Sequence, residues 1–392
     1  MEIKYSIIIF LLFFCSNLVS AGTELVPAAP KIRASSYLLI DFNSDRLLVS
    51  ENTEQKLAPV LVSENSEQKL APASLTKMMT VYVVASELAD GKISLDEEVL
   101  VSKKAWKMPG SRMFIEVNKK VSVADLLKGV IIQSGNDASV ALAEYIAGSE
   151  DVFAQMMNQH AQRLGLKHTH YMNSTGLPDE QHYTTAYDLA LLAKALIRDF
   201  QDIYDLHAVK KFTFNGITQS NRNKLLWSDK SVDGIKTGHT EEAGFCLVAS
   251  AKRNDMRLIS VVLGTDSEKT REMASQALTN YGFRFYETKK LYSMGDIVTS
   301  ARIWKGETDN VDLGVSRDLY ITIPRGQFRN LNAVFDLPET IIAPIIQGEK
   351  QGKMKLILSD REILNEFLVA LHDVNEASLF DRLKDDIRLI FE

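Results

Sequence analysis

The sequence predicts an α+β protein in which an antiparallel sheet flanked by helices is followed by a small all-β domain and a terminal amphipathic helix. Strand-like apolar runs stand at both ends of the first 286 residues, and helical patterns lie between them. One sheet covered by helices would bury both kinds of element. Beyond about Glu287 the apolar runs become short and are punctuated by glycine and proline, which is typical of an all-β domain.

Length and composition are those of an ordinary folded protein. The chain has 392 residues, enough for two domains, and 45% of them are apolar while 24% are charged. The formal net charge of −6 argues against a nucleic-acid partner, which would favour a basic surface.

The N-terminus, residues 1–21, has the pattern of a secretory signal peptide. Lys4 precedes the apolar run Ile7–Phe14, and Val19–Ala21 offers small residues for cleavage. The bulky phenylalanine before Cys15 departs from the pattern of a lipidation site, so we expect no lipid there. Cleavage would leave Cys246 as the remaining cysteine, and hence no intrachain disulfide. We therefore expect an exported protein that does not depend on disulfide bonds.

The mature chain is predicted to begin with a β-hairpin. Ser35–Asp41 has the pattern of a strand, Asn43–Asp45 that of a turn, and Arg46–Ser50 that of the return strand.

A tandem duplication of 13 residues overlaps the return strand. Leu48–Pro59 is repeated as Leu61–Pro72, and the two copies differ only at Thr53 and Ser66. Either copy could supply the strand while the other is extruded as a loop. We favour a tolerated surface loop because loop insertions cost little free energy. A new functional element is the alternative.

The remaining segments follow clear periodicities. The helix predicted at Leu75–Leu88 is apolar nearly all round, so we expect it to be central and buried. The three apolar runs between Val232 and Gly264 are expected to form an antiparallel meander. The predicted helices are Leu75–Leu88, Val121–Ile132, Ala138–Ile146, Val152–Leu164, Thr185–Ile197 and Glu268–Phe283; the predicted strands are Val232–Gly238, Gly244–Ala251, Met256–Gly264, Leu319–Pro324, Leu331–Phe335 and Met354–Leu358.

A candidate nucleophile and base stand at the start of the central helix. Ser74 and Lys77 are three residues apart, so on a helix both side chains lie on one face. A serine hydroxyl becomes a good nucleophile when a neighbouring base takes its proton, and a lysine amine can be that base if its pKa is lowered. Pro72 suits a helix start, which would aim backbone N–H groups at the serine. The same spacing also fits a solvated helix start.

Two further motifs follow in order along the chain. Ser134-Gly135-Asn136 lies between two apolar helices, and Lys236-Thr237-Gly238 lies on a predicted strand. Each alone is typical of a turn or a strand end. Together with Ser74 and Lys77 they match the motif set Ser-x-x-Lys, Ser-x-Asn and Lys-Thr-Gly of the penicillin-recognising serine enzymes.

Within that group, the stretches Ala71–Thr80, Gln133–Ala138 and Asp233–Thr240 resemble the low-molecular-mass penicillin-binding proteins that are serine-type D-alanyl-D-alanine carboxypeptidases. The resemblance covers nearly the whole mature chain. It implies a β-lactamase/transpeptidase-like domain at residues 22–286, a small all-β domain at 287–375 and an amphipathic helix at 376–392. It implies no metal and no cofactor.

The resemblance also implies roles for the acylation residues. Ser74 would attack the carbonyl between the two D-alanines of a peptidoglycan stem peptide, with Lys77 as base because Lys236 nearby lowers its pKa. Ser134 would relay a proton to the leaving D-alanine. Asn136 would hold Lys77 and the substrate amide.

Strand residues would bind the substrate. Lys236 and Thr237 would hold the terminal carboxylate, for which a cation and a hydroxyl donor are suited. Backbone N–H groups of Ser74 and His239 would form the oxyanion hole. Gly238 would let the substrate backbone approach the strand. Water would then hydrolyse the acyl-enzyme, whereas a β-lactam would acylate the same serine and leave slowly.

Alternative sites are less well supported by the sequence. His168, His170 and His182 are loosely spaced, and no His-Glu-x-x-His motif indicates zinc. Cys246 has no evident catalytic partner and fits a core position. Arg222 and Arg257 could bind substrate carboxylates, but arginines are mostly solvated, and we leave both outside the predicted site.

Three rival functions remain. A β-lactamase would share the acylation residues but need fast deacylation, and we find no convincing glutamate-containing loop for it. Endopeptidase action on cross-links is a close variant. A non-catalytic wall-binding protein that keeps the fold is a different class of answer, which the intact Ser74 and Lys77 argue against.

The last stretch predicts an amphipathic helix that either associates with a membrane or docks on the β-domain. In Ser378–Glu392 the apolar residues fall within roughly a third of a helical wheel, and the charged residues lie outside it. About 15 residues cannot span a bilayer but could lie in its surface. A helix docked on the β-domain is the alternative. We expect the protein at the periplasmic face of the inner membrane, with peptidoglycan pentapeptide as substrate and β-lactams as acylating inhibitors.

Overall fold

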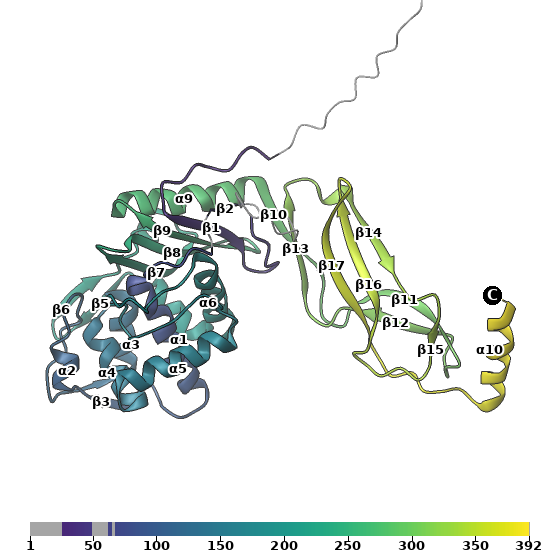
Figure 1. Ribbon diagram of the computed structural model, residues 1–392, viewed down its shortest axis with the longest axis horizontal. Helices are drawn as coiled ribbons and strands as arrows, with labels where there is room; N and C mark the ends of the chain where they lie inside the picture. The colour runs from purple at the N-terminus through teal and green to yellow at the C-terminus, as the bar shows by residue number, and fades with distance from the viewer. Residues whose placement is uncertain (1–25, 49–61, 65–66, 392) are drawn as a thin grey trace, which may run out of the picture.

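The computed structural model describes residues 26–48, 62–64 and 67–391, which form two domains and a terminal helix (Figure 1). The predicted signal peptide, including Cys15, lies outside the described residues.

The first domain alternates between strands and helices, with its long strands at the two ends of its sequence. Its elements are β1 (Ser36–Asp41), β2 (Val62–Glu64), η1 (Ala73–Thr76), α1 (Lys77–Ala89), β3 (Glu98–Leu100), α2 (Lys103–Trp106), β4 (Lys120–Ser122), α3 (Val123–Ile132), α4 (Asn136–Ala147), α5 (Glu150–Arg163), α6 (Ala186–Asp199), α7 (Gln201–Tyr204), η2 (Asp205–Ala208), β5 (Lys211–Phe214), β6 (Ile217–Ser220), α8 (Leu225–Ser228), β7 (Val232–Thr240), β8 (Gly244–Arg253), β9 (Met256–Thr265) and α9 (Glu268–Phe285).

Five strands of this domain form one antiparallel sheet in the order β2-β1-β9-β8-β7. Side chains of β1 alternate between its two faces: Leu38 and Ile40 join the core of the helical layer, while Tyr37 and Leu39 join the core beneath α9. Because both faces are covered, every residue of β1 is buried. Figure 1 shows α9 along one face and the other long helices on the opposite face. The predicted sheet flanked by helices is confirmed.

The return strand of the predicted hairpin differs from expectation. The Leu48 N–H donates to the Leu39 carbonyl (2.9 Å), and Leu39 is also the strand partner of Val62. The first copy of the duplication therefore begins the return strand and the second copy continues it, rather than one copy supplying it all. Residues 49–61, as many as the repeat is long, lie outside the described residues.

The second domain is built of strands, as predicted. Its elements are β10 (Tyr286–Tyr292), β11 (Ile297–Trp304), β12 (Asn310–Gly314), β13 (Leu319–Pro324), η3 (Phe328–Asn330), β14 (Leu331–Asp336), β15 (Ile341–Ile342), β16 (Lys350–Leu358) and β17 (Arg361–Ala370). Strands β10 and β13 form one pair, and the others form a sheet in the order β14-β16-β17-β12-β11-β15. Residues such as Ile321, Ile323 and Leu356 pack between them in a core of their own.

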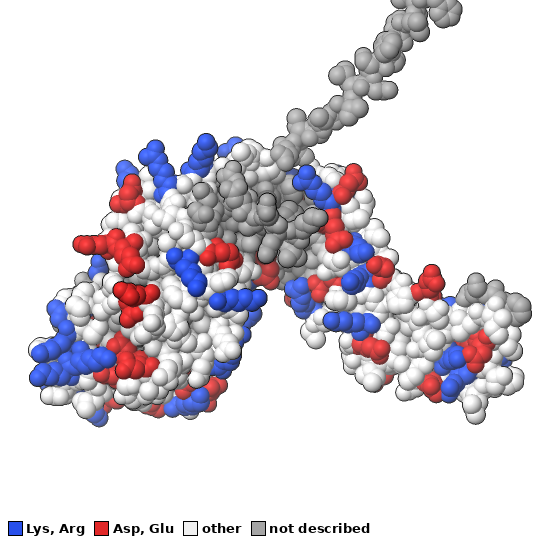
Figure 2. Space-filling model, viewed as in Figure 1, with Lys and Arg blue, Asp and Glu red and all other residues white. Residues whose placement is uncertain are grey.

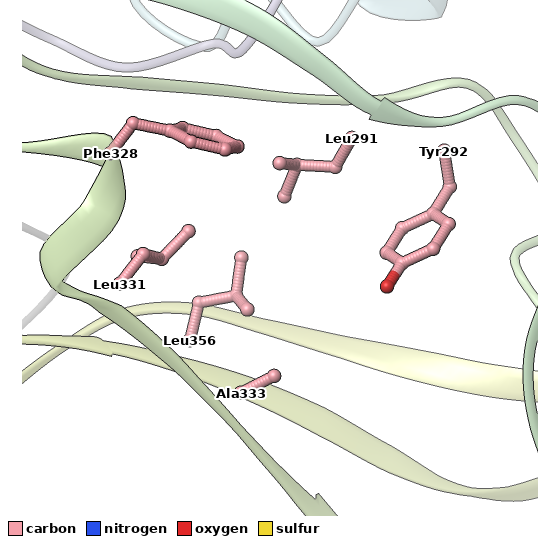
Figure 3. A pocket seen from close by; sticks show the side chains of 6 residues that line it. All are labelled: Leu291, Tyr292, Phe328, Leu331, Ala333 and Leu356. Carbon is pink, nitrogen blue, oxygen red and sulfur yellow. The ribbon is translucent and has the colours of Figure 1, made fainter.

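A small apolar pocket of about 270 Å³ opens in this second domain. Figure 3 shows Phe328, Leu291, Leu331 and Leu356 turned toward one another across it, with Tyr292 at its side. Of the described residues that line the pocket, Tyr292 alone carries a polar side-chain atom. The pocket therefore lacks the groups that acyl transfer needs.

Hydroxyl groups join the two domains. Thr288 Oγ1 on β10 donates to Asp41 Oδ2 at the end of β1 (2.7 Å), and it lies 2.8 Å from Thr322 Oγ1 on β13. Thr322 Oγ1 is also 2.6 Å from Ser44 Oγ. Asp41 and Thr322 are fully buried, so the domains meet through a buried polar network at this point.

The terminal helix α10 (Leu379–Phe391) directs its apolar face to solvent. Leu379 and Ile390 are each 78% exposed, and Phe380, Leu383 and Ile387 are also exposed. Its polar side faces the β-domain, where the Lys305 N–H donates to Asp385 Oδ2 (2.8 Å) and Lys305 Nζ lies 2.5 Å from Asp386 Oδ1. Within the described part of the chain, no helix is long and apolar enough to cross a membrane.

Candidate active site

The candidate nucleophile stands on a tight turn just before the central helix. Ser74 belongs to η1, whose first residue, Ala73, has a positive φ of 47°, and α1 begins at Lys77. The predicted helix start is thus a 3₁₀ turn. Its i→i+3 geometry is tighter than that of an α-helix, a difference that sequence periodicity does not resolve over four residues.

Two glycines from distant segments fit closely against this turn. A Cβ on Gly176 would lie 1.8 Å from the Ala73 carbonyl oxygen, and Gly176 has φ of 82°. A Cβ on Gly238 would lie 3.1 Å from the Pro72 carbonyl oxygen and 3.2 Å from Leu75 Cγ. Gly238 is therefore packed against the turn that carries the serine, and the approach of a substrate backbone at this glycine stays a prediction.

The amine of Lys77 is held by three oxygen atoms. Lys77 Nζ lies 3.1 Å from Ser74 Oγ, 2.7 Å from Asn136 Oδ1 and 2.6 Å from the Thr175 carbonyl oxygen. An amide oxygen and a backbone carbonyl can only accept hydrogen bonds, whereas a hydroxyl can also donate. When the amine is neutral, its two N–H bonds satisfy Asn136 and Thr175, and its lone pair is left facing the Ser74 hydroxyl. This arrangement orients a base toward the nucleophile.

Burial makes Lys77 a base near neutral pH. The side chain is fully buried, and desolvation lowers the pKa of Lys77 to about 7, although Asp137 and Glu150 act in the opposite direction. The expectation that Lys236 lowers this pKa is wrong: burial dominates, because removing an ammonium from water is costly whatever its neighbours.

Asn136 is fixed by a neighbouring loop. Its Nδ2 donates to the Pro109 carbonyl oxygen (2.7 Å), and its backbone N–H donates to the Ser111 carbonyl oxygen (2.7 Å). The next residue, Asp137, accepts from the backbone N–H groups of Met113 (3.0 Å) and Phe114 (2.9 Å). The loop and the amide therefore hold each other in position.

Ser134 occupies a strained turn beside Asn136. It has a positive φ of 66°, uncommon for a residue with a side chain, and is 4% exposed. Its Oγ has no hydrogen-bond partner among the described residues. A buried hydroxyl without a partner is costly, so this group is available to a substrate.

The third motif lies on β7, at the edge of the sheet. Lys236 and Thr237 are buried, and Lys236 Nζ donates to the Thr237 carbonyl oxygen (2.9 Å). Burial first, and then the charges of Lys77, Arg222 and Arg271, hold the pKa of Lys236 well below its usual range. An incoming carboxylate would favour the charged form again. His239 is exposed and stacks on Phe245 with ring centroids 3.9 Å apart.

Some residues of the site carried no sequence signal. Thr175 contributes its backbone carbonyl, which every residue possesses, and Gly176 is required by a contact between distant segments. Asn173 Oδ1 accepts from the Gly176 N–H (2.7 Å) and so fixes that loop. Arg271 reaches the back of β7, where its Nη1 lies 3.4 Å from the Gly238 carbonyl oxygen.

The alternative candidates have structural roles. His182 Nε2 lies 2.9 Å from Thr76 Oγ1, and His170 Nδ1 lies 2.8 Å from the Gln181 carbonyl oxygen. Among the residues that the structure describes, no three His, Cys, Asp or Glu side chains form a group that could hold a metal ion. Cys246 is a buried core residue, and Arg257 pairs with Asp233 at 2.7 Å.

A buried glutamate close enough to Lys77 to affect its pKa has other bonding partners. Glu150 Oε1 accepts from the Ser174 hydroxyl (2.8 Å), and Glu150 Oε2 lies 2.9 Å from Lys104 Nζ. Both oxygens are occupied, so this carboxylate is poorly placed to activate the fast deacylation of a β-lactamase.

This arrangement of a serine hydroxyl, a buried lysine amine and an unpartnered second hydroxyl is the one that a serine acyl-transfer enzyme needs, and the comparisons with known proteins give the family. The family model for D-alanyl-D-alanine carboxypeptidase, Peptidase S11, matches residues 58–267, and that for the C-terminal domain of penicillin-binding protein 5 matches residues 286–376. The chain belongs to the D-alanyl-D-alanine carboxypeptidase family S11, and the family and enzyme class expected from the sequence are confirmed.

Relatives match over almost the whole length. D-alanyl-D-alanine carboxypeptidase DacA of Escherichia coli K12 is 40% identical over 96% of this chain and 94% of its own. DacC of the same organism is 42% identical over 97% and 94%. The crystal structure of penicillin-binding protein 5 from Haemophilus influenzae superposes with a TM-score of 0.84 at 41% identity, covering 89% of this chain and all of that one.

Proposed function

We propose that Ser74 is the nucleophile with which this protein removes the terminal D-alanine from peptidoglycan stem peptides. The observation that supports this most directly is the placement of Lys77 Nζ between two fixed acceptors and the Ser74 hydroxyl. Lys77 takes the hydroxyl proton as Ser74 Oγ bonds to the carbonyl carbon between the two D-alanines. Backbone N–H groups of Ser74 and His239 stabilise the resulting oxyanion.

The leaving group departs with a proton. The bond between the carbonyl carbon and the D-alanine nitrogen breaks, and the proton on Lys77 passes through the Ser134 hydroxyl to that nitrogen. Water then attacks the acyl carbon and Lys77 takes a proton from it. The bond between that carbon and Ser74 Oγ breaks, Lys77 passes this proton to Ser74 Oγ, and the shortened peptide leaves. Lys236 and Thr237 hold the terminal carboxylate before the first step, and Asn136 holds both Lys77 and the substrate amide.

β-Lactams are proposed to acylate the same serine and to leave slowly. Penicillin-binding protein D2 from Listeria monocytogenes has been solved in an ampicillin-bound form, with a TM-score of 0.57 and 26% identity to this chain. The acyl-enzyme is expected to be stable because water reaches the penicilloyl group on Ser74 poorly.

Two reagents test the catalytic proposal. Fluorescent penicillin should label the purified protein and not the Ser74→Ala variant, and diacetyl-Lys-D-Ala-D-Ala should release D-alanine. Absence of label on the intact protein would refute the enzyme assignment in favour of a non-catalytic wall-binding protein. Rapid turnover of penicillin would instead favour a β-lactamase, and cleavage of cross-linked muropeptides would add endopeptidase activity.

The mature protein is proposed to lie on the periplasmic face of the inner membrane, exported by residues 1–21 and held by α10. The apolar face of α10 is exposed while its acidic residues bond to Lys305, so the apolar face is free to enter a lipid surface. Deleting residues 378–392, or replacing Leu383 and Ile387 by glutamate, should release the protein from membrane fractions. Lys384→Gln on the polar side is the control; retention of the deletion variant would exclude the helix as anchor.

A further inference from the structure

A basic hollow of about 840 Å³ lies where the two domains meet. The described residues that line it include five cationic side chains and a single acidic one, Asp255, although the whole chain has a net charge of −6. The cationic residues are Arg198, Lys252, Arg257, Lys289 and Lys290. Figure 2 shows Lys and Arg side chains on both sides of the notch between the two lobes.

Two of these cations remain available to a ligand. Three of the five are paired: Arg257 with Asp233 at 2.7 Å, Lys290 with Asp318 at 2.6 Å and Arg198 with Asp199 at 2.6 Å. Lys252 is exposed, at the end of β8, and its amine has no partner among the described residues. Lys289, on the opposite wall, is 44% exposed; its amine lies 3.8 Å from Glu287 Oε2 and 4.3 Å from the centre of the Phe328 ring, so no acid holds it at hydrogen-bond distance. Lys252 and Lys289, one on each wall, are therefore the two lining cations that no described acid holds at hydrogen-bond distance.

The other lining residues suit a carbohydrate. Phe42 and Tyr320 are partly buried aromatic side chains from the two domains. Asn43 and Gln201 add amide oxygens as acceptors, while their amide nitrogens donate to the Asp255 carbonyl oxygen (2.9 Å) and Asp205 Oδ1 (2.7 Å). Aromatic faces pack against the apolar faces of sugar rings, amides bond to hydroxyls, and ammonium groups bind carboxylates through charge-assisted hydrogen bonds. An anionic glycan presents all of these partners together.

The hollow is separate from the catalytic cluster. Gly238 of the third motif pairs with Cys246 on β8, and Lys252 lies six residues further along that strand. At the rise of a β-strand this is about 20 Å. A small dipeptide in the catalytic site cannot reach Lys252, whereas a polymer can contact both places.

We propose that the hollow is a second binding site for peptidoglycan, which holds the sugars and free stem-peptide carboxylates of a strand while another stem peptide is cleaved at Ser74. The proposal rests on the proposed function for its choice of polymer. Its consequence is that the hollow contributes to binding of the intact wall polymer and contributes nothing to hydrolysis of a short peptide.

The test compares charge reversal in the hollow with charge reversal elsewhere. The double variant Lys252→Glu, Lys289→Glu is matched by Lys230→Glu, Lys269→Glu, which changes two exposed lysines outside the hollow and the net charge equally. Both are made in the full mature chain and in a Ser74→Ala form for sedimentation with purified sacculi at low salt. We expect the hollow variant to bind sacculi about tenfold more weakly than the control variant.

Two further measurements separate the possible outcomes. The hollow variant and the control variant, both with Ser74 intact, should be labelled by penicillin equally and should hydrolyse diacetyl-Lys-D-Ala-D-Ala equally. If the unaltered protein is not labelled at all, the catalytic proposal is refuted. Sacculus binding then tests the hollow separately. Converting sacculus carboxylates to methylamides should abolish the difference between variants. Equal sacculus binding by the hollow and control variants would overturn the proposal. The proposal would also be overturned if the hollow variant bound only phosphatidylglycerol vesicles, and not sacculi, more weakly than the control variant.

Discussion

Replacing Asn136 by aspartate should move the pH dependence of acylation without removing the nucleophile. In the native protein the neutral Oδ1 of Asn136 lies 2.7 Å from Lys77 Nζ, and burial lowers the pKa of Lys77 to about 7. The competent form is the free amine, so the rate of acylation rises with pH through about 7 and then reaches a plateau. Asn136→Asp puts a negative charge at the same place, which favours the ammonium form.

The magnitude follows from the distance. A full charge at 2.7 Å interacts with about 6 kcal/mol at an effective dielectric constant of ~20, and the cost of burying the new carboxylate opposes it. Close opposite charges commonly shift a pKa by about one to three units, so we expect the Lys77 pKa near 9 and a rate at pH 7 that falls about 50-fold.

The assay is the second-order rate of labelling by fluorescent penicillin between pH 6 and pH 10. The variant should regain most of its rate above pH 9, where Lys77 is again neutral. The Asn136→Ala variant is the control, because it removes the amide without adding charge and should be slow at every pH. A midpoint that stays near 7 in Asn136→Asp, or a loss that is uniform with pH, would refute the assignment of Lys77 as the titrating base.

Three other changes test the supporting structure. Gly176→Ala would place a Cβ 1.8 Å from the Ala73 carbonyl oxygen at a positive φ, so it should lower the free energy of unfolding by about 3 kcal/mol or more in urea denaturation and slow acylation. Excision of residues 49–61 joins Leu48 to Val62, the two residues that lie opposite Leu39. The kcat/KM on diacetyl-Lys-D-Ala-D-Ala should then stay within about tenfold of the value for the unaltered protein. A larger loss would mean that the extra copy shapes the site. Thr322→Val removes a buried hydroxyl that bonds both domains and should cost about 1–3 kcal/mol in the same denaturation experiment, while leaving penicillin labelling unchanged.

The sequence predicted the fold well where periodicity was long. The meander β7–β9 and the helices α3 to α6 lie close to their expected bounds because apolar residues recur there over nine or more positions. The all-β character of the second domain was also predicted, although its strand order depends on pairings between residues far apart in the chain. The division of the return strand between two copies of a repeat could not be predicted, because the copies are almost identical.

The sequence predicted the side chains that meet in the site but not the backbone group that completes it. Ser74, Lys77 and Asn136 meet in the structure as their motifs suggested, but the third acceptor of Lys77 is a backbone carbonyl from a loop near residue 175. A backbone atom leaves no signature in sequence. The cause of the lowered Lys77 pKa was also missed, because burial depends on all the elements that pack around α1.

The edge position of β2 has a practical consequence. β2 and β7, the strand that carries Lys236 and Thr237, form opposite edges of the sheet, four strand spacings or about 19 Å apart. An edge strand is hydrogen-bonded to a neighbouring strand on one side only, so a peptide inserted into it disturbs the hydrogen bonds to one neighbour rather than two. The natural insertion between Leu48 and Val62 uses such a place. The same position should accept a foreign epitope or reporter peptide, giving a labelled enzyme whose catalytic edge is untouched.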